Sequence, residues 1–193
     1  KLGARVIAFI DTPGSALTQP GKSEHLIVYP VNEQLKFFML ANYLMYKNGE
    51  FPEYDRYNQE MEAHLAKALA EVEISADAWA YHYAKEQVAF KQAHPDLPHY
   101  YIGSGTQYGA TYSYAMCYWE EQMWVRTKSI SCPEFFHGMQ EIIEADTPVT
   151  LFMGEDEQRP LAERVARFLP KVCANYTIID TKEFALKGIS PEY

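Results

Sequence analysis

The chain has 193 residues and a formal net charge of -9, with 17 lysines and arginines against 26 aspartates and glutamates. A hydrophobic fraction of 48% with 22% charged residues is typical of a globular protein and excludes a disordered chain. The acidic balance argues against a nucleic acid partner, because phosphate backbones are bound by clustered lysines and arginines. It does not exclude a single phosphate monoester, which a few backbone N–H groups can hold.

The cysteines Cys117, Cys132 and Cys173 are widely spaced and form no CxxC pair or metal-binding cluster. This usage predicts reduced thiols, a cytoplasmic protein and no metal site. No run reaches the roughly 18 to 20 apolar residues of a membrane span, so no membrane partner is expected. The chain enters an apolar run at once, without an initial Met, and this predicts that upstream sequence is missing.

The first part of the chain contains two short apolar runs of the kind found in buried parallel strands. Residues 5–10 form the first run and end at the turn Asp11-Thr-Pro-Gly14, and residues 25–29 repeat the pattern. Apolar residues recurring every three or four positions predict a helix over residues 32–47. We therefore expect residues 1–50 to be the closing part of a doubly wound sheet domain.

The middle of the chain is predicted to be helical. Two helices are expected, over residues 54–72 and 76–93, and Pro95 and Pro98 end the helical stretch. We interpret residues 51–97 as a helical linker between two halves that each contain a sheet.

Strands and helices alternate over residues 98–193 at the spacing of a parallel sheet. Strands are predicted over residues 100–102, 148–153 and 176–180. Helices are predicted from the loop after the first strand to about residue 125, and over residues 136–144 and 159–168. A loop is predicted over residues 129–133. The predicted fold class is therefore α/β, with a doubly wound parallel sheet.

A loop of small residues, Gly103-Ser-Gly-Thr-Gln-Tyr108, joins a predicted strand to a predicted helix. Such a loop brings backbone N–H groups to a helix N-terminus, where anions bind. It lacks the third glycine of a dinucleotide-binding fingerprint and the lysine of a P-loop, so nucleotide binding is not supported. The candidate ligand contacts are Ser104, Gly105, Thr106 and Gln107. The alternative is a tight turn whose residues only cap the helix that follows.

A second motif, Ser131-Cys-Pro-Glu-Phe-Phe-His-Gly138, places Glu134 and His137 three residues apart. Histidine is suited to proton transfer near neutral pH, and Glu134 could contact a ligand or orient the loop that carries the histidine. The alternative is a capped helix start with a structural histidine.

These motifs resemble the second domain of the sugar isomerase (SIS) family of flavodoxin-like α/β sandwiches. The loop at 103–108, the pair Glu120-Glu121 and the run 134–138 follow the order and spacing found in two groups. One is the isomerase half of glucosamine-6-phosphate synthase, and the other is the bacterial fructosamine-6-phosphate (Amadori product) deglycases. The resemblance is strong over residues 100–180 and weak over residues 1–49, which resemble the tail of a first SIS domain.

The resemblance also implies roles for individual residues. In both groups a glutamate sixteen residues before the motif histidine acts as general base, and the histidine acts as general acid. Glu121 and His137 stand at these positions here. Glu120 is a rival base, but neighbours about 100° apart on a helix cannot both face one pocket, and we favour Glu121. The family's main phosphate-binding loop has no counterpart in this chain, and Met139 stands where many relatives have proline.

The activity implied by the resemblance is cleavage of a 6-phosphorylated fructosamine, such as fructoselysine 6-phosphate, to glucose 6-phosphate and an amino acid or amine. Two alternatives are a sugar-phosphate isomerase or aminotransferase half, and a non-catalytic phosphosugar-binding regulatory domain. Relatives supply the histidine across a dimer interface, so a homodimer is expected. No cofactor is implied, because the chemistry needs only proton transfers.

Overall fold

The computed structural model describes residues 5–20, 25–28 and 33–193, and the chain divides into two compact units. The first unit comprises residues 1–63 with Tyr193, and the second comprises residues 64–192. The division into a first-domain tail, a linker and a second SIS domain stays a prediction.

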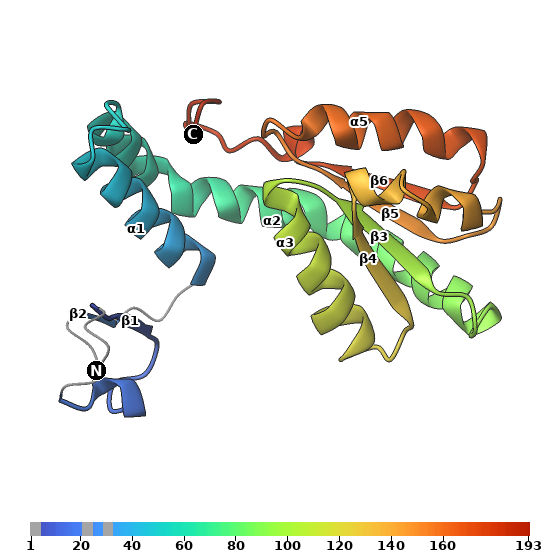
Figure 1. The fold of residues 1–193 in the computed structure, drawn as a ribbon, viewed down its shortest axis with the longest axis horizontal. Helices are drawn as coiled ribbons and strands as arrows, with labels where there is room; N and C mark the ends of the chain where they lie inside the picture. Colours follow the sequence, from blue (N-terminus) through green and yellow to red (C-terminus); the bar gives the residue numbers. More distant parts are fainter. Residues whose placement is uncertain (1–4, 21–24, 29–32) are drawn as a thin grey trace. The chain divides into compact units, whose positions relative to one another are not determined.

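The first unit contains a pair of parallel strands and a helix, as the apolar runs predict (Figure 1). Its elements are β1 (Ile7–Ile10), a 3-10 turn (Ala16–Thr18), β2 (His25–Val28) and α1 (Glu33–Lys47). Tyr29 and Asn32, the predicted ends of the second strand and of the helix, lie outside the described residues.

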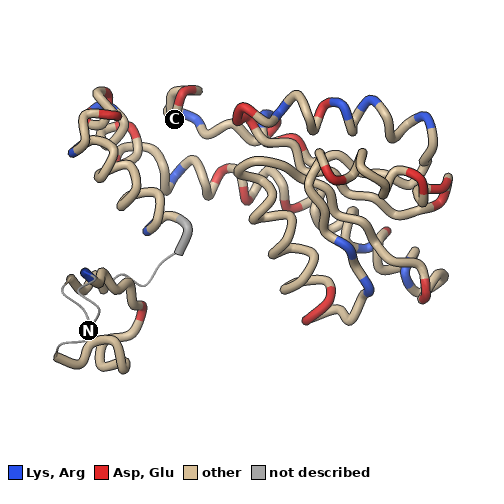
Figure 2. The backbone as a smooth tube through the Cα atoms, in the orientation of Figure 1, with Lys and Arg blue, Asp and Glu red and all other residues tan. Residues whose placement is uncertain are grey.

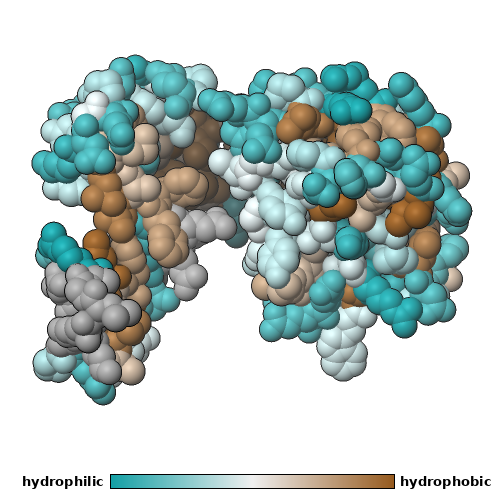
Figure 3. All heavy atoms as spheres, in the orientation of Figure 1, coloured by the Kyte–Doolittle hydropathy of each residue, from teal (hydrophilic) through white to brown (hydrophobic). Residues whose placement is uncertain are grey.

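Large apolar side chains remain exposed on the first unit, and Figure 3 shows them as brown atoms along α1. Phe37 is 64% exposed, Phe38 55% and Leu44 50%. All four residues of β2 are also exposed. A contiguous apolar surface of this kind is typical of a face that packs against another protein surface.

A single helix of 40 residues, α2 (Tyr54–Ala93), replaces the two predicted helices. The predicted break between residues 72 and 76 is wrong, because no glycine or proline interrupts the run. Ser75 fits within the helix, because its hydroxyl donates to the carbonyl oxygen of Val72 at 2.9 Å. Within the ranges described, no helix combines the length and the apolar composition that a membrane span requires.

The second unit is built on a four-stranded parallel sheet, which confirms the predicted α/β fold class. Its order is β4-β3-β5-β6, and the bounds are β3 (His99–Gly103), β4 (Thr127–Ser131), β5 (Val149–Met153) and β6 (Tyr176–Asp180). Strand β4 was not predicted, and the loop expected at 129–133 is wrong in its first residues. Four of the five residues of β4 are polar and it lies at the sheet edge, so it shows no apolar run.

The helices of the second unit match the predictions in part. The observed elements are α3 (Thr106–Ser113), a π-helix (Tyr114–Glu120), α4 (Cys132–Phe135), a 3-10 turn (Met139–Ile142) and α5 (Arg159–Phe168), with further 3-10 turns at Leu169–Lys171 and Thr181–Phe184. The predicted helix over residues 136–144 is wrong. Gly138 is extended, with φ -176°, and separates α4 from the 3-10 turn.

Helices cover both faces of this sheet, and each face has its own core. Ile102, Phe135 and Leu151 belong to the core under α4 and α5. Tyr101 and Trp119 belong to the opposite core, under α2, α3 and the π-helix. Figure 1 shows α5 and α3 on different sides of the sheet. The segments that carry Glu121 and His137 therefore lie on opposite faces.

Candidate functional site

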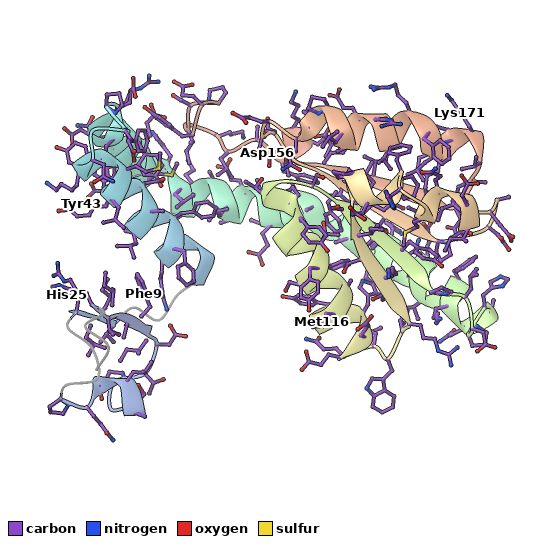
Figure 4. The ribbon with its side chains drawn as sticks, in the orientation of Figure 1. Phe9, His25, Tyr43, Met116, Asp156 and Lys171 are labelled. Carbon is purple, nitrogen blue, oxygen red and sulfur yellow. The ribbon has the colours of Figure 1, made fainter. Side chains whose placement is uncertain are left out.

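The loop between β3 and α3 is held by a carboxylate from the loop after β5. The backbone N–H of Thr106 donates to Asp156 Oδ2 at 2.6 Å, and the Thr106 hydroxyl donates to the same oxygen at 2.7 Å. These hydrogen bonds lower the pKa of Asp156. Asp156, labelled in Figure 4, thus supplies the negative charge that a helix N-terminus attracts.

Gly105 shows how closely the two loops approach. Its φ is +58°, and a Cβ at this position would lie 2.2 Å from Asp156 Oδ2. Its N–H donates to Gln158 Oε1 at 3.2 Å. Only glycine satisfies both the backbone angle and the contact. Sequence analysis did not single out Asp156 and Gln158, although their place directly after a predicted strand was a usable signal.

The other predicted ligand contacts of this loop also have partners within the protein. Ser104 is buried, and its hydroxyl oxygen accepts from the N–H of Cys132 at 3.3 Å. The carbonyl oxygen of Gln107 accepts from the hydroxyl of Thr111 at 2.7 Å. The local geometry therefore serves to join β3, β4 and β5 at their carboxyl ends. Ligand contact by Ser104, Gly105, Thr106 and Gln107 stays a prediction.

His137 lies in an open groove of about 580 Å³ along the edge strand β4. Ser131 caps α4 by accepting from the N–H of Glu134 at 3.5 Å, and the N–H of His137 donates to the carbonyl oxygen of Glu134 at 3.0 Å. Glu134, His137 and Lys128 all line the groove. The structure thus brings Glu134 and His137 together, with an exposed imidazole at the edge of the sheet.

Glu121 directly follows the π-helix, on the other face of the sheet. Its N–H donates to the carbonyl oxygen of Met116 at 2.9 Å, the i to i-5 spacing of a π-helix. The side chain is exposed and is not among those that line the His137 groove. Insertions of this kind in an α-helix are frequent at functional sites, because they change the direction of the side chains that follow.

Glu120, the rival base, has a structural partner. Its Oε1 accepts from the hydroxyl of Thr127 at 2.5 Å, a bond that joins the end of the π-helix to the start of β4. The carboxylate of Glu121 has no such partner in the part of the chain that the structure describes. Of the two neighbours, Glu121 is the one whose carboxylate is left available to a ligand.

A buried polar cluster not singled out from the sequence lies under α2. Thr150 Oγ1 is 2.8 Å from His99 Nε2 and 2.7 Å from the Tyr83 hydroxyl. Burial lowers the pKa of His99 to about 3 and raises that of Tyr83. Both groups are therefore neutral at neutral pH, and the cluster joins α2 to β3 and β5 without offering a proton donor that titrates near neutrality.

The chain was compared with known proteins. No family model matches it. It is 29% identical over 198 residues to the fructosamine deglycase FrlB of Bacillus subtilis, covering 97% of this chain and 57% of that protein. The chain thus spans a little over half the length of this relative.

Solved structures show the same fold. A candidate phosphosugar isomerase from Bacillus subtilis aligns with a TM-score of 0.73 and 25% identity, over 96% of this chain and 56% of its own. A candidate phosphosugar isomerase from Salmonella typhimurium aligns with a TM-score of 0.83 and 23% identity, over 98% and 59%. The C-terminal domain of glucosamine-fructose-6-phosphate aminotransferase from Francisella tularensis aligns with a TM-score of 0.58 and 14% identity, over 92% and 52%. In sequence the chain is thus similar to a fructosamine deglycase, and in fold it is similar to phosphosugar isomerases.

Proposed function

We propose that the protein cleaves a 6-phosphorylated fructosamine to glucose 6-phosphate and an amino acid or amine. The observation that carries the proposal is an exposed His137 beside Glu134 in an open groove, in a chain similar along 97% of its length to a fructosamine deglycase. A phosphosugar substrate also agrees with the phosphosugar isomerases that share the fold.

The proposed chemistry consists of proton transfers and the addition of water. In the substrate, C1 bears the amine and C2 is a ketone, so the C1 proton is acidic. Glu121 removes that proton to give an enaminol, and protonation at C2 then leaves an imine at C1. Water adds to C1, and the C1–N bond breaks as His137 protonates the departing nitrogen. The products balance one substrate and one water.

We propose that two copies of the chain combine to form each active site. Glu121 and His137 lie on segments that cover opposite faces of one sheet, so Glu121 of one copy would meet the groove of another. A stripe of exposed apolar side chains on the segment that carries Glu121 supports this arrangement. Tyr108, Tyr112 and Met116 recur every four residues and are 38%, 46% and 39% exposed; Met116 is labelled in Figure 4.

Asp156 argues against one possible position of the substrate phosphate. This carboxylate occupies the N-terminus of α3, and a phosphate there would meet a like charge. We therefore propose that the phosphate binds elsewhere in the assembled protein, and that the loop at 104–107 shapes the site without holding the phosphate.

Incubating the full-length protein with several phosphorylated fructosamines tests the activity. Glucose 6-phosphate is expected as product, detected as NADPH formed by glucose-6-phosphate dehydrogenase. The unphosphorylated fructosamines serve as controls, assayed by release of the free amine, and should not turn over. Binding of the phosphorylated compounds without turnover would contradict the proposal and favour a regulatory role, and conversion of fructose 6-phosphate to an aldose phosphate would favour an isomerase.

A further inference from the structure

We propose that a groove beside α5 binds a phosphate monoester at a site separate from the His137 groove. Its walls come from the turn that follows α4 and from α5 with the 3-10 turn after it, and its volume is about 650 Å³. Arg164, Arg167 and Lys171 line it against one carboxylate, that of Glu141. In a chain with a net charge of -9, this local excess of positive charge favours an anionic ligand.

Arg164 is positioned for a ligand by an aromatic ring. Its guanidinium carbon lies 4.0 Å from the ring centroid of Phe136, and no carboxylate in the described ranges pairs with it. This contact holds the guanidinium against the ring, where its N–H groups can donate to the oxygens of a phosphate. Arg159 on the same helix is different, since Asp180 binds its two terminal nitrogens at 2.9 and 2.6 Å.

Arg167 and Lys171 extend the positive charge of the groove. Arg167 lies three residues after Arg164 on α5, so the two share a face of the helix, and Lys171 follows in the 3-10 turn after α5. Arg167 lies 3.9 Å from Glu163, a carboxylate that already accepts from Arg159 at 3.1 Å. Figure 2 shows blue Lys and Arg positions along α5 and after it, and Figure 4 marks Lys171.

Gln140 also lines the groove. Its Oε1 atom is buried with no hydrogen-bond partner among the described residues, while its Nε2 donates to Glu141 at 3.3 Å. A buried acceptor without a donor is costly. Because this atom is buried, a ligand in the groove is bound through the positively charged side chains and not through the Gln140 carbonyl.

The groove is distinct from the proposed catalytic groove but adjacent to it in sequence. Phe136 and Gln140 line the α5 groove, whereas His137 and Met139 line the other. A ligand beside α5 would therefore contact the turn that holds His137. The proposal concerns binding alone, and it does not depend on the deglycase activity.

Binding of glucose 6-phosphate to the full-length protein, measured by isothermal titration calorimetry at constant ionic strength, tests this site. The double variant Arg164→Gln/Lys171→Gln should lose one binding site per chain, or lose affinity at that site on the order of tenfold, the equivalent of about 1.4 kcal/mol. Lys85→Gln, which removes one exposed positive charge from α2 away from the groove, should leave the isotherm unchanged. Glucose, which lacks the phosphate, should not bind.

Because the substituted side chains are exposed, circular dichroism should confirm that both variants remain folded. An isotherm that is the same in the wild type and the double variant overturns the proposal, as does an equal loss in Lys85→Gln. If the deglycase proposal fails, the site beside α5 should still bind and still be lost in the double variant.

Discussion

Replacing His137 with alanine in the full-length protein should lower the turnover of a phosphorylated fructosamine by about a hundredfold to ten-thousandfold, the range for a general acid or base. Glu121→Gln should cause a loss of the same order, because glutamine keeps the shape of the side chain but cannot accept the C1 proton. The readout is the initial rate of glucose 6-phosphate formation at saturating substrate. KM should change less than kcat if both groups act mainly in the transition state.

Glu120→Gln is the matched control for Glu121→Gln, since it makes the same change one residue away. It weakens the bond to Thr127 and should lower the rate less than about tenfold, well below the effect of losing a general base. A large loss in Glu120→Gln with a small loss in Glu121→Gln would show that the base is Glu120.

Truncating Phe135 should destabilise the second unit by about 3–5 kcal/mol, the cost of a cavity left by a buried aromatic ring. The ring is fully buried and packs edge-on against Phe136 at 5.1 Å and Phe168 at 5.8 Å between ring centroids. Urea unfolding followed by circular dichroism would measure the loss for Phe135→Ala.

Ile142→Ala is the control for this change, because Ile142 is 56% exposed and should cost no more than about 0.5 kcal/mol. A loss below about 1 kcal/mol in Phe135→Ala would contradict the central place given to this ring in the core under α4 and α5. Since domains are stable by only about 5–15 kcal/mol, the expected loss is a large part of the total.

The parts of the fold that sequence predicted well are those with a strong apolar pattern. The strands β5 and β6 and the helix α5 lie where the apolar runs and the amphipathic period place them. Strand β4 could not be found in this way, because Thr127-Lys-Ser-Ile-Ser has one large apolar residue and pairs only through its backbone with β3. Strand pairing of this kind depends on tertiary contacts, which local patterns do not encode.

The sequence suggested which residues form the candidate site, but it did not predict how they are arranged in space. The resemblance to the SIS family implied roles for Glu121 and His137, but only the structure shows that their segments cover opposite faces of the sheet. The role of Asp156 was missed because it depends on β3 and β5 being neighbours, which brings two distant loops together. A local sequence motif can suggest which residues are suited to a reaction, but it does not show which distant residues lie beside them.

Mixing inactive Glu121→Gln chains with inactive His137→Ala chains tests most directly whether each active site is shared between two copies. Random reassembly into dimers would give some sites with both residues intact, so activity should return to about a quarter of the wild-type value. Mixed dimers can be verified by a tag on one variant. If mixed dimers form and the mixture stays inactive, the two residues do not act across two copies, and the proposed site is wrong.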